Sequence, residues 1–363
     1  MKRRKVTVWM MMAATALTGL TACQSDDEPQ GNAAAQLPIT LTASIGEDNT
    51  RSYNATNLLN GDTCYVWADM VNGSTQAVTE YFKAWTLIAN GSGGLSPQVS
   101  GNTKLFPATN VLNFYALVGN FGKETEGERA GEPKVEPEVM ALPETGILHT
   151  VKADQSTETG YYKSDLLYSV KLAQEPISEA VVLPFKHLLS RIQVVIVAGD
   201  GISQSDLTTN LTSVELLGVK QQVIFAPDKA ADFTSQTDLT GMLSEPANVV
   251  SGNITMAKGV VGSVSDATAP GSTVYADAII VPQTFAANTQ LIKVSYLGRD
   301  TYYTVPTGGM TFESGKQYRF RLIADRIGET YEINSVTMDA WGAASDTQMW
   351  FDNLSGTTTL GGN

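Results

Sequence analysis

Apolar and polar residues alternate along many short stretches of this chain. The clearest alternation covers residues 37–45. Its apolar members are Leu37, Ile39, Leu41, Ala43 and Ile45. A period of two is typical of a β-strand with one buried face. Further alternating or β-branched runs predict strands at residues 192–196, 274–281, 291–297 and 318–322. No long stretch has the spacing of an amphipathic helix, so the pattern predicts an all-β fold of short strands packed as β-sandwiches.

Polar segments rich in Gly, Pro, Glu and Lys interrupt the strands and predict loops. They lie at residues 121–146, 171–180 and 228–240. A chain of 363 residues has the length of about two domains. We place the boundary in the second loop, which gives an N-terminal sandwich at residues 52–178 and a C-terminal sandwich at residues 179–330. Residues 331–363 are predicted to hold further strands.

Composition and charge narrow the function. Charged residues make up 17% of the chain, and the formal net charge is −13. An acidic surface repels phosphate, which argues against nucleic acid as a partner. Two His and two Cys cannot form a Cys/His metal cluster and make most histidine-based active sites improbable. Since no phosphate-binding glycine motif occurs either, we expect neither an enzyme nor a cofactor.

The two histidines have plain structural interpretations. His187 lies close to Ser190, which suggests a hydrolase, but the serine is not in a GxSxG turn and no acid is near in sequence. An imidazole packed in a core or a domain junction is the favoured interpretation. His149 stands beside Thr150 in a loop-like stretch and is predicted to be a surface residue.

The thiol and indole side chains are also assigned to the core. Cys64 lies in an apolar run with no basic residue beside it, which predicts a buried and unreactive thiol. The tryptophans of the body are Trp67, Trp85, Trp341 and Trp350. Core packing is favoured for them, and stacking platforms for a glycan are the alternative.

The N-terminus reads as an export signal. Basic residues 2–5 precede a mostly apolar run at residues 6–20, which is too short to span a bilayer. The following Leu20-Thr21-Ala22-Cys23 resembles the bacterial lipobox. That resemblance implies that residues 1–22 are a signal peptide and that Cys23 is acylated. Residues 24–28 are acidic and resemble the surface-export signal of Bacteroidetes lipoproteins; a solvated linker is the alternative.

Several segments, in this order, resemble the fimbrillin family, the pilin subunits of Bacteroidales. They are the lipobox, the strand ending in Asn49-Thr50-Arg51, the run from Asn60-Gly61-Asp62 to Trp67, Phe106-Pro107 with Asn113-Phe114-Tyr115-Ala116, Asp165-Leu166-Leu167-Tyr168, residues 183–192, residues 313–318 and a last strand reaching Trp341.

The resemblance implies two transthyretin-like β-sandwich domains and a defined assembly route. The lipoprotein would reach the outer membrane at the cell surface. An Arg-specific surface protease would then remove a propeptide with the first strand, and a strand of another pilin subunit would replace it. Residues 331–363 are the candidate donor strand. The role as stalk, tip or anchor subunit stays open.

The residues themselves support this route at one place. A polar, turn-forming loop at residues 46–50 follows the alternating strand and leads to Arg51 and Ser52. An exposed loop with an arginine is a good site for proteolysis, so we predict cleavage between these two residues, which makes residues 23–51 the propeptide. Loss of the preceding strand would leave apolar pockets and unpaired backbone groups. The rival hypothesis is a monomeric surface lipoprotein that binds glycans.

Overall fold

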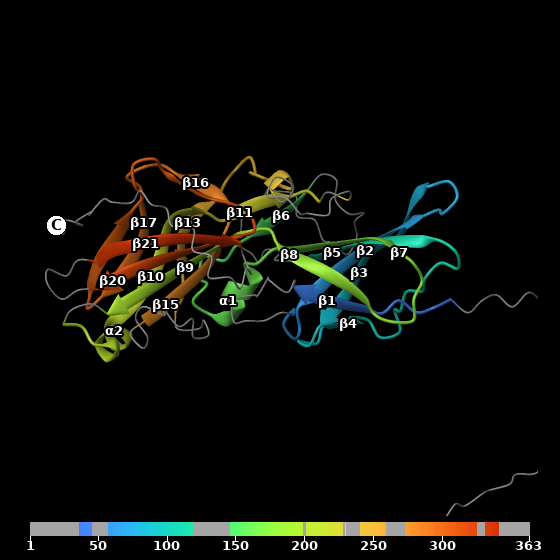
Figure 1. The fold of residues 1–363 in the computed structure, drawn as a ribbon, viewed down its shortest axis with the longest axis horizontal. Coiled ribbons are helices and arrows are strands. Elements are labelled where there is room, and N and C mark those ends of the chain that lie inside the picture. Colours follow the sequence, from blue (N-terminus) through green and yellow to red (C-terminus); the bar gives the residue numbers. More distant parts are fainter. Residues whose placement is uncertain are drawn as a thin grey trace, which may run out of the picture. The chain divides into compact units, whose positions relative to one another are not determined.

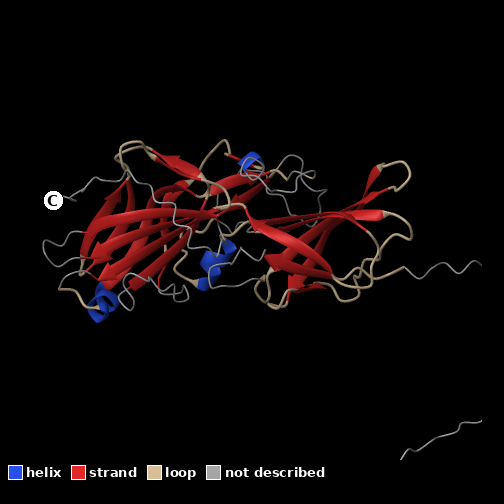
Figure 2. Ribbon diagram, in the orientation of Figure 1, coloured by secondary structure: helices blue, strands red, loops and turns tan. Residues whose placement is uncertain are grey.

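The protein consists almost entirely of β-strands. The computed structural model describes residues 36–45, 57–119, 146–198, 201–227, 229, 240–258, 273–324 and 331–340. Strands dominate these residues, and the helices among them are short (Figure 2). The predicted all-β fold is confirmed. In the described part of the chain, no helix is long and apolar enough to cross a bilayer.

Seven strands form one sheet that closes on itself, in the order β1-β4-β3-β2-β5-β7-β8. We call this sheet the first barrel (Figure 1). Its strands are β1 Leu41–Ile45, β2 Thr63–Val71, β3 Val78–Ala89, β4 Gly94–Pro97, β5 Val111–Val118, β7 Leu167–Gln174 and β8 Val181–His187. Alternate residues of these strands point inward, as in β8, where Val181, Leu183 and Phe185 are buried and Val182 and Pro184 are exposed.

Two further sheets form what we call the second sandwich. One has the order β13-β10-β17-β18 and the other has the order β14-β15-β9-β20-β21. The strands of the first are β10 Leu211–Lys220, β13 Ser251–Thr255, β17 Gln290–Tyr296 and β18 Arg299–Thr304. Those of the second are β9 Ser190–Ala198, β14 Ala257–Lys258, β15 Thr273–Ile280, β20 Lys316–Ala324 and β21 Tyr331–Ala340. Val194 of β9 and Val214 of β10 belong to the same buried cluster, so the two sheets share one core.

Smaller elements complete the fold. Strands β6 Ile147–Thr150, β11 Gln222–Phe225 and β12 Leu243–Ser244 form a three-stranded sheet. Strands β16 Gln283–Phe285 and β19 Met310–Phe312 pair with each other. Among the described residues, α1 Glu158–Lys163 and α2 Gln204–Asn210 are helices with both ends defined. Each begins at a capping hydroxyl, Thr157 for α1 and Ser203 for α2, which accepts a backbone N–H of the first turn.

The chain leaves the first barrel between β8 and β9. The sequence boundary at residues 178/179 precedes β8, yet β8 pairs with β7 and β1 of the barrel. Strand β6 comes before β7 in sequence but pairs with β11, which follows the first strands of the second sandwich. The chain therefore crosses between the two groups of strands more than once.

Candidate functional site

The candidate site is the first strand, which closes the first barrel between two neighbours. On one side β1 pairs in parallel with β8 over five positions, from Leu41 opposite Val181 to Ile45 opposite Phe185. On the other side it pairs antiparallel with β4, where Leu41 lies opposite Leu95. Without β1, the edges of both neighbours would be open.

Burial along this segment follows the predicted alternation from Ile39 onward. The side chains of Ile39, Leu41, Ala43 and Ile45 are at most 3% exposed. Thr40 between them faces solvent. Leu37 is 37% exposed, so its predicted place in the inward row is wrong. It precedes the strand, where the neighbouring Pro38 forms only an isolated bridge to Leu105.

Backbone hydrogen bonds hold the segment beyond the strand pairing. The N–H of Ile39 donates to the carbonyl of Lys104 at 2.8 Å, and the N–H of Val181 donates to the carbonyl of Thr40 at 2.9 Å. The N–H of Ala43 donates to the carbonyl of Gly93 at 2.7 Å. Each large apolar side chain buried here contributes about 1.5–3 kcal/mol. Removal of the segment would therefore unpair backbone groups and expose the barrel interior together.

Close backbone approach on the β4 side depends on glycine. Gly93 has φ of +93°, and a Cβ at this position would lie 3.3 Å from the carbonyl oxygen of Ala43. At Gly94, a Cβ would lie 2.5 Å from the side-chain amide nitrogen of Asn90. The Asn90 Oδ1 accepts the N–H groups of Ser92 and Gly94, which fixes the loop that leads into β4.

The predicted processing residues lie outside the described part of the chain. The described residues stop at Ile45 and resume at Asn57, so Arg51 and Ser52 fall in the interval between them. Cys23 also lies outside it. Lipidation and cleavage remain predictions about residues on the N-terminal side of, and just after, β1.

The histidines are buried, and only one of the two predictions holds. His187 is 2% exposed, as expected for a packed imidazole, and its Nδ1 lies 3.0 Å from Oδ2 of Asp165. Sequence reasoning missed this acid because it lies on the loop before β7. Ser190 donates its hydroxyl to the carbonyl of Glu313 at 2.8 Å, which leaves it committed to a backbone acceptor.

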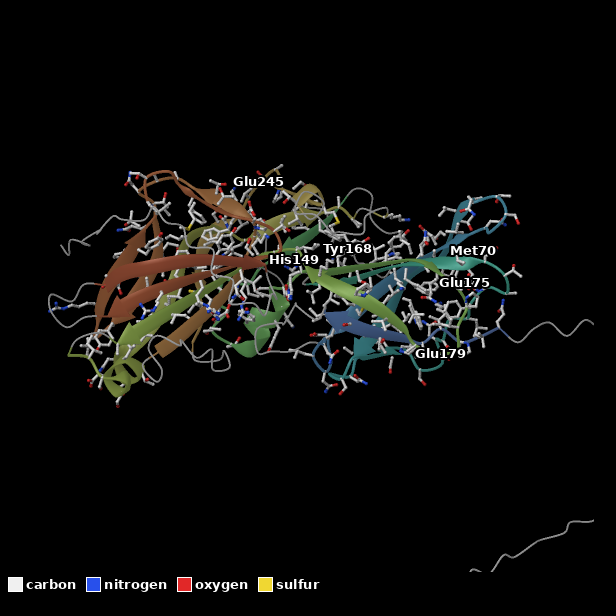
Figure 3. The ribbon with its side chains drawn as sticks, viewed as in Figure 1. Met70, His149, Tyr168, Glu175, Glu179 and Glu245 are labelled. Carbon is white, nitrogen blue, oxygen red and sulfur yellow. The ribbon has the colours of Figure 1, made fainter. Side chains whose placement is uncertain are left out.

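The prediction that His149 is a surface residue is wrong. Its exposure is 0%, and its Nε2 lies 3.0 Å from the carbonyl of Ser164. Burial, partly offset by this hydrogen bond, lowers the pKa of His149 to about 4. The residue is in β6, which pairs with β11 along its whole length. Figure 3 shows His149 and Tyr168 among the side chains that fill the space between strands.

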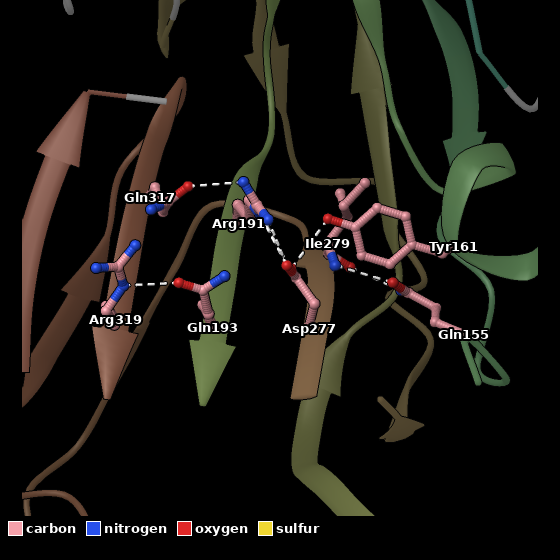
Figure 4. Close-up of polar contacts among 8 residues, drawn as sticks. All are labelled: Gln155, Tyr161, Arg191, Gln193, Asp277, Ile279, Gln317 and Arg319. Atoms are coloured by element: carbon pink, nitrogen blue, oxygen red, sulfur yellow. Dashed lines mark hydrogen bonds and ion pairs between the residues drawn. The ribbon is translucent and has the colours of Figure 1, made fainter. Parts of the chain in front are cut away.

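A second polar cluster is buried on the second sandwich (Figure 4). Arg191 of β9 donates from Nε to both carboxylate oxygens of Asp277 at 3.1 and 3.0 Å, and from Nη1 to Gln317 Oε1 at 2.8 Å. The Tyr161 hydroxyl donates to the same carboxylate at 3.0 Å. Burial alone would lower the pKa of Arg191, but Asp277 outweighs it and raises the pKa. The cluster links α1 to the sheet through Tyr161, and the charges of Arg191 and Asp277 pair with each other.

The other candidate residues are core residues where the structure describes them. Cys64 is fully buried, and burial raises the pKa of its thiol, in agreement with an unreactive cysteine. Trp67 and Trp85 are 2% and 3% exposed, which confirms core packing and removes them as glycan platforms. Trp341 and Trp350 lie outside the described residues. Across the described residues, no group of three or more His, Cys, Asp or Glu could hold a metal ion.

One family model matches the chain, and solved structures share its fold. The model of the fimbrillin-like family matches residues 50–341. No curated protein matches the chain. A solved structure of a proposed cell adhesion protein from Bacteroides uniformis has 16% identity and a TM-score of 0.53, covering 84% of this chain and 98% of its own. A second, from Bacteroides ovatus, has 15% identity and a TM-score of 0.55, covering 83% and 97%. At these identities the two structures establish the fold.

Proposed function

Because the chain belongs to the fimbrillin-like family and is therefore a structural pilus subunit, we propose that it is a surface-exported lipoprotein that polymerises after losing its first strand. Acylation at Cys23 anchors the precursor in the outer membrane. An Arg-specific protease cuts between Arg51 and Ser52 and releases residues 23–51, which include β1. A strand of another pilin subunit then occupies the vacated position.

The observation that carries this proposal is the place of β1 in the first barrel. The strand lies at the N-terminal end of the described fold, yet it fills a position between two strands; it inserts three buried side chains, and Ile39 just before it adds a fourth. Its backbone continues directly into the segment with the proposed cleavage site. Removing it would open one gap in the closed sheet, with pairing groups on both sides. An extended strand from another chain supplies the same backbone bonds and side chains.

The route is tested by replacing Arg51 in cells that carry the protease. Arg51→Ala is expected to accumulate full-length chain that incorporates labelled fatty acid, and to stop fibre formation. Arg51→Lys is the matched control, because it keeps the positive charge but not the side chain that an Arg-specific protease requires. Both variants should therefore fail to be processed, as read by mass spectrometry of the N-terminus.

Three outcomes would contradict the route. Normal fibres from Arg51→Ala would show that cleavage at this residue is unnecessary. Processing of Arg51→Lys with an unchanged N-terminus would show that the protease is not Arg-specific. Full-length chain that accumulates in Arg51→Ala without labelled fatty acid would remove Cys23 from the route.

A further inference from the structure

The inward row formed by Ile39 and the buried residues of β1 has an uneven order of side-chain sizes. Ile39 and Leu41 are large, Ala43 is small, and Ile45 is large again. All four are at most 3% exposed, so each side chain is enclosed by the barrel. A strand that needed only apolar surface could carry a large residue at every inward position. The alanine therefore indicates that space is short at one point along the row.

The surroundings of Ala43 account for that shortage. On the β8 side it lies opposite Leu183, which is fully buried. On the β4 side its N–H donates to the carbonyl of Gly93 at 2.7 Å, so its backbone is held between the two neighbouring strands and cannot shift to make room for a longer side chain. The barrel interior holds a cluster of aromatic rings formed by Phe82, Trp85, Phe106 and Phe114. Because protein interiors are close-packed, neighbours already fill the volume that a longer side chain would need.

We infer that the position of Ala43 is a size filter, which selects the strand that occupies the gap between β4 and β8. The accepted strand has inward residues in the order large, large, small, large, read in either direction along the gap. This inference rests on the proposed strand replacement for its role in assembly, but the filter itself is a property of the intact barrel.

The filter points to a subunit other than a second copy of this chain. Residues 331–363 are the candidate donor strand of a second copy, so their order of sizes can be compared with the accepted one. We class Val, Ile, Leu, Met, Phe, Tyr and Trp as large and Gly, Ala and Ser as small. No set of four residues taken at every second position of this segment follows the accepted order in either direction. Two of the nearest runs lack only the last large residue: Tyr331, Ile333, Ser335, Thr337 and Val336, Met338, Ala340, Gly342. The preferred occupant is therefore a strand of a different pilin subunit.

The filter is tested first in the full-length, uncleaved protein. We compare Ala43→Val and Ala43→Leu with Thr40→Leu, which adds similar apolar bulk at an exposed position of the same segment. The readout is hydrogen exchange at the amides of Ala43 and Val181, both of which bond across β1. Protection should fall progressively from Ala to Val to Leu, by at least tenfold for Leu, and stay within twofold for Thr40→Leu. Ala43→Val keeps the test valid if the leucine variant does not fold.

Equal or greater protection in both Ala43 variants would overturn the filter. Such a result would mean that the added apolar surface strengthens the binding of β1 to the barrel, with no limit set by space.

The occupant is tested with the processed subunit purified from cells. Labelled peptides are offered that match residues 37–46, the same peptide with Ala43→Leu, the same peptide with Thr40→Leu, and residues 331–343. The first and third should bind with similar affinity, the second at least tenfold more weakly, and the fourth not measurably. Binding of the fourth as tight as the first would overturn the assignment to a different subunit. If no peptide binds while the full-length test succeeds, the filter stands and the proposed strand replacement fails.

Discussion

The acid–base behaviour of His149 follows from its burial. The imidazole has no exposure, and its Nε2 lies 3.0 Å from the carbonyl of Ser164. Burial is the largest influence and lowers its pKa; the hydrogen bond and Asp165 raise it, and Lys152 lowers it further. The result is a pKa of about 4, compared with 6.5 for an exposed histidine. Between pH 4 and 6.5, His149 is therefore protonated in the unfolded chain but neutral in the folded protein.

We predict that this residue makes the protein less stable in mild acid. Above pH 6.5 both states are neutral at His149, and the free energy of unfolding is unaffected. Between pH 6.5 and 4 the unfolded chain gains the proton and the folded protein does not, so stability falls as pH falls, by at most about 3 kcal/mol. His149→Gln keeps a donor for Ser164 but does not titrate. Denaturant unfolding at pH 7 and pH 4.5 should show a smaller loss for this variant than for the natural chain; equal losses would contradict the prediction.

For single residues, burial was predicted correctly where the neighbours in sequence are apolar and wrongly where they are polar. Cys64 and Trp67 stand in apolar runs, and both are core residues. His149 was assigned to the surface because its neighbours in sequence look loop-like. It lies in β6, which pairs with the distant strand β11, and its imidazole contacts the carbonyl of Ser164. The carboxylate of Asp165 beside His187 was missed for the same reason, since no local pattern reports a contact between separate strands.

At the scale of elements, one side chain acts as a pairing partner for a strand. Gln155 lies before α1, and its Nε2 donates to the carbonyl of Ile279 at 2.7 Å. Its Oε1 accepts the N–H of Ile279 at 2.8 Å. The neighbouring strand β14 pairs with β15 only at Asp277 and Ala276. The side chain of Gln155 thus supplies the hydrogen bonds of Ile279 in β15 at a position that β14 does not reach.

Replacement of Gln155 should destabilise the second sandwich. Gln155→Leu keeps most of the volume but leaves the N–H and carbonyl of Ile279 buried without these bonds, at an expected cost of about 2–4 kcal/mol. Gln98→Leu is the control, because that side chain is exposed, and it should cost less than about 0.5 kcal/mol. Urea unfolding measures both. Similar midpoints for the two variants would show that the Gln155 bonds contribute little.

The strands were more predictable than their boundaries and partners. The alternating runs of the sequence correspond to β1, β9, β15, β17 and β20. The first began too early, because Leu37 is apolar but lies outside the strand. The two short helices have no sustained apolar period and depend on a capping hydroxyl, which is a signal of only one residue.

At the scale of the whole molecule, the two groups of strands share buried contacts. Trp67 and Tyr115 of the first barrel belong to the same buried cluster as the core of the second sandwich. The ring of Tyr168 in β7 lies 5.0 Å from that of Phe225 in β11. Lys229 adds an ion pair to Asp69 of β2 at 2.8 Å. Since the lysine is about two-fifths exposed, the apolar contacts contribute most of the coupling.

These contacts predict that residues 36–340 unfold as one cooperative unit. Scanning calorimetry of the natural chain should show a single transition. Tyr168→Ala removes the aromatic contact between β7 and β11 and should split it into two, besides costing about 3–5 kcal/mol. Phe106→Ala truncates a ring within the first barrel core, so it should lower the midpoint and leave one transition. Two transitions in the natural chain, or a split caused by Phe106→Ala, would contradict the shared core.

The overall topology could not be read from the sequence. Alternation predicted that residues 37–45 form a strand with one buried face, and the family resemblance implied that it is removable. The parallel partner, β8, was not predicted, because pairing between distant strands leaves no local pattern. The crossing of β6 to β11 was missed for the same reason. The size of Ala43 within the row was visible from the start, but its meaning required the partners on both sides.

The pairing of β1 with β8 also favours one order of events during folding. Thr42 and Val181 are separated by 139 positions, and the strand cannot dock until the chain has been made that far. Closing so long a loop costs entropy that the nearby hairpins do not lose, so β2, β3, β5 and β7 can associate earlier. The strand that comes first in the sequence is thus the last to join its sheet. An element that docks late onto a framework already formed can also depart without dismantling that framework.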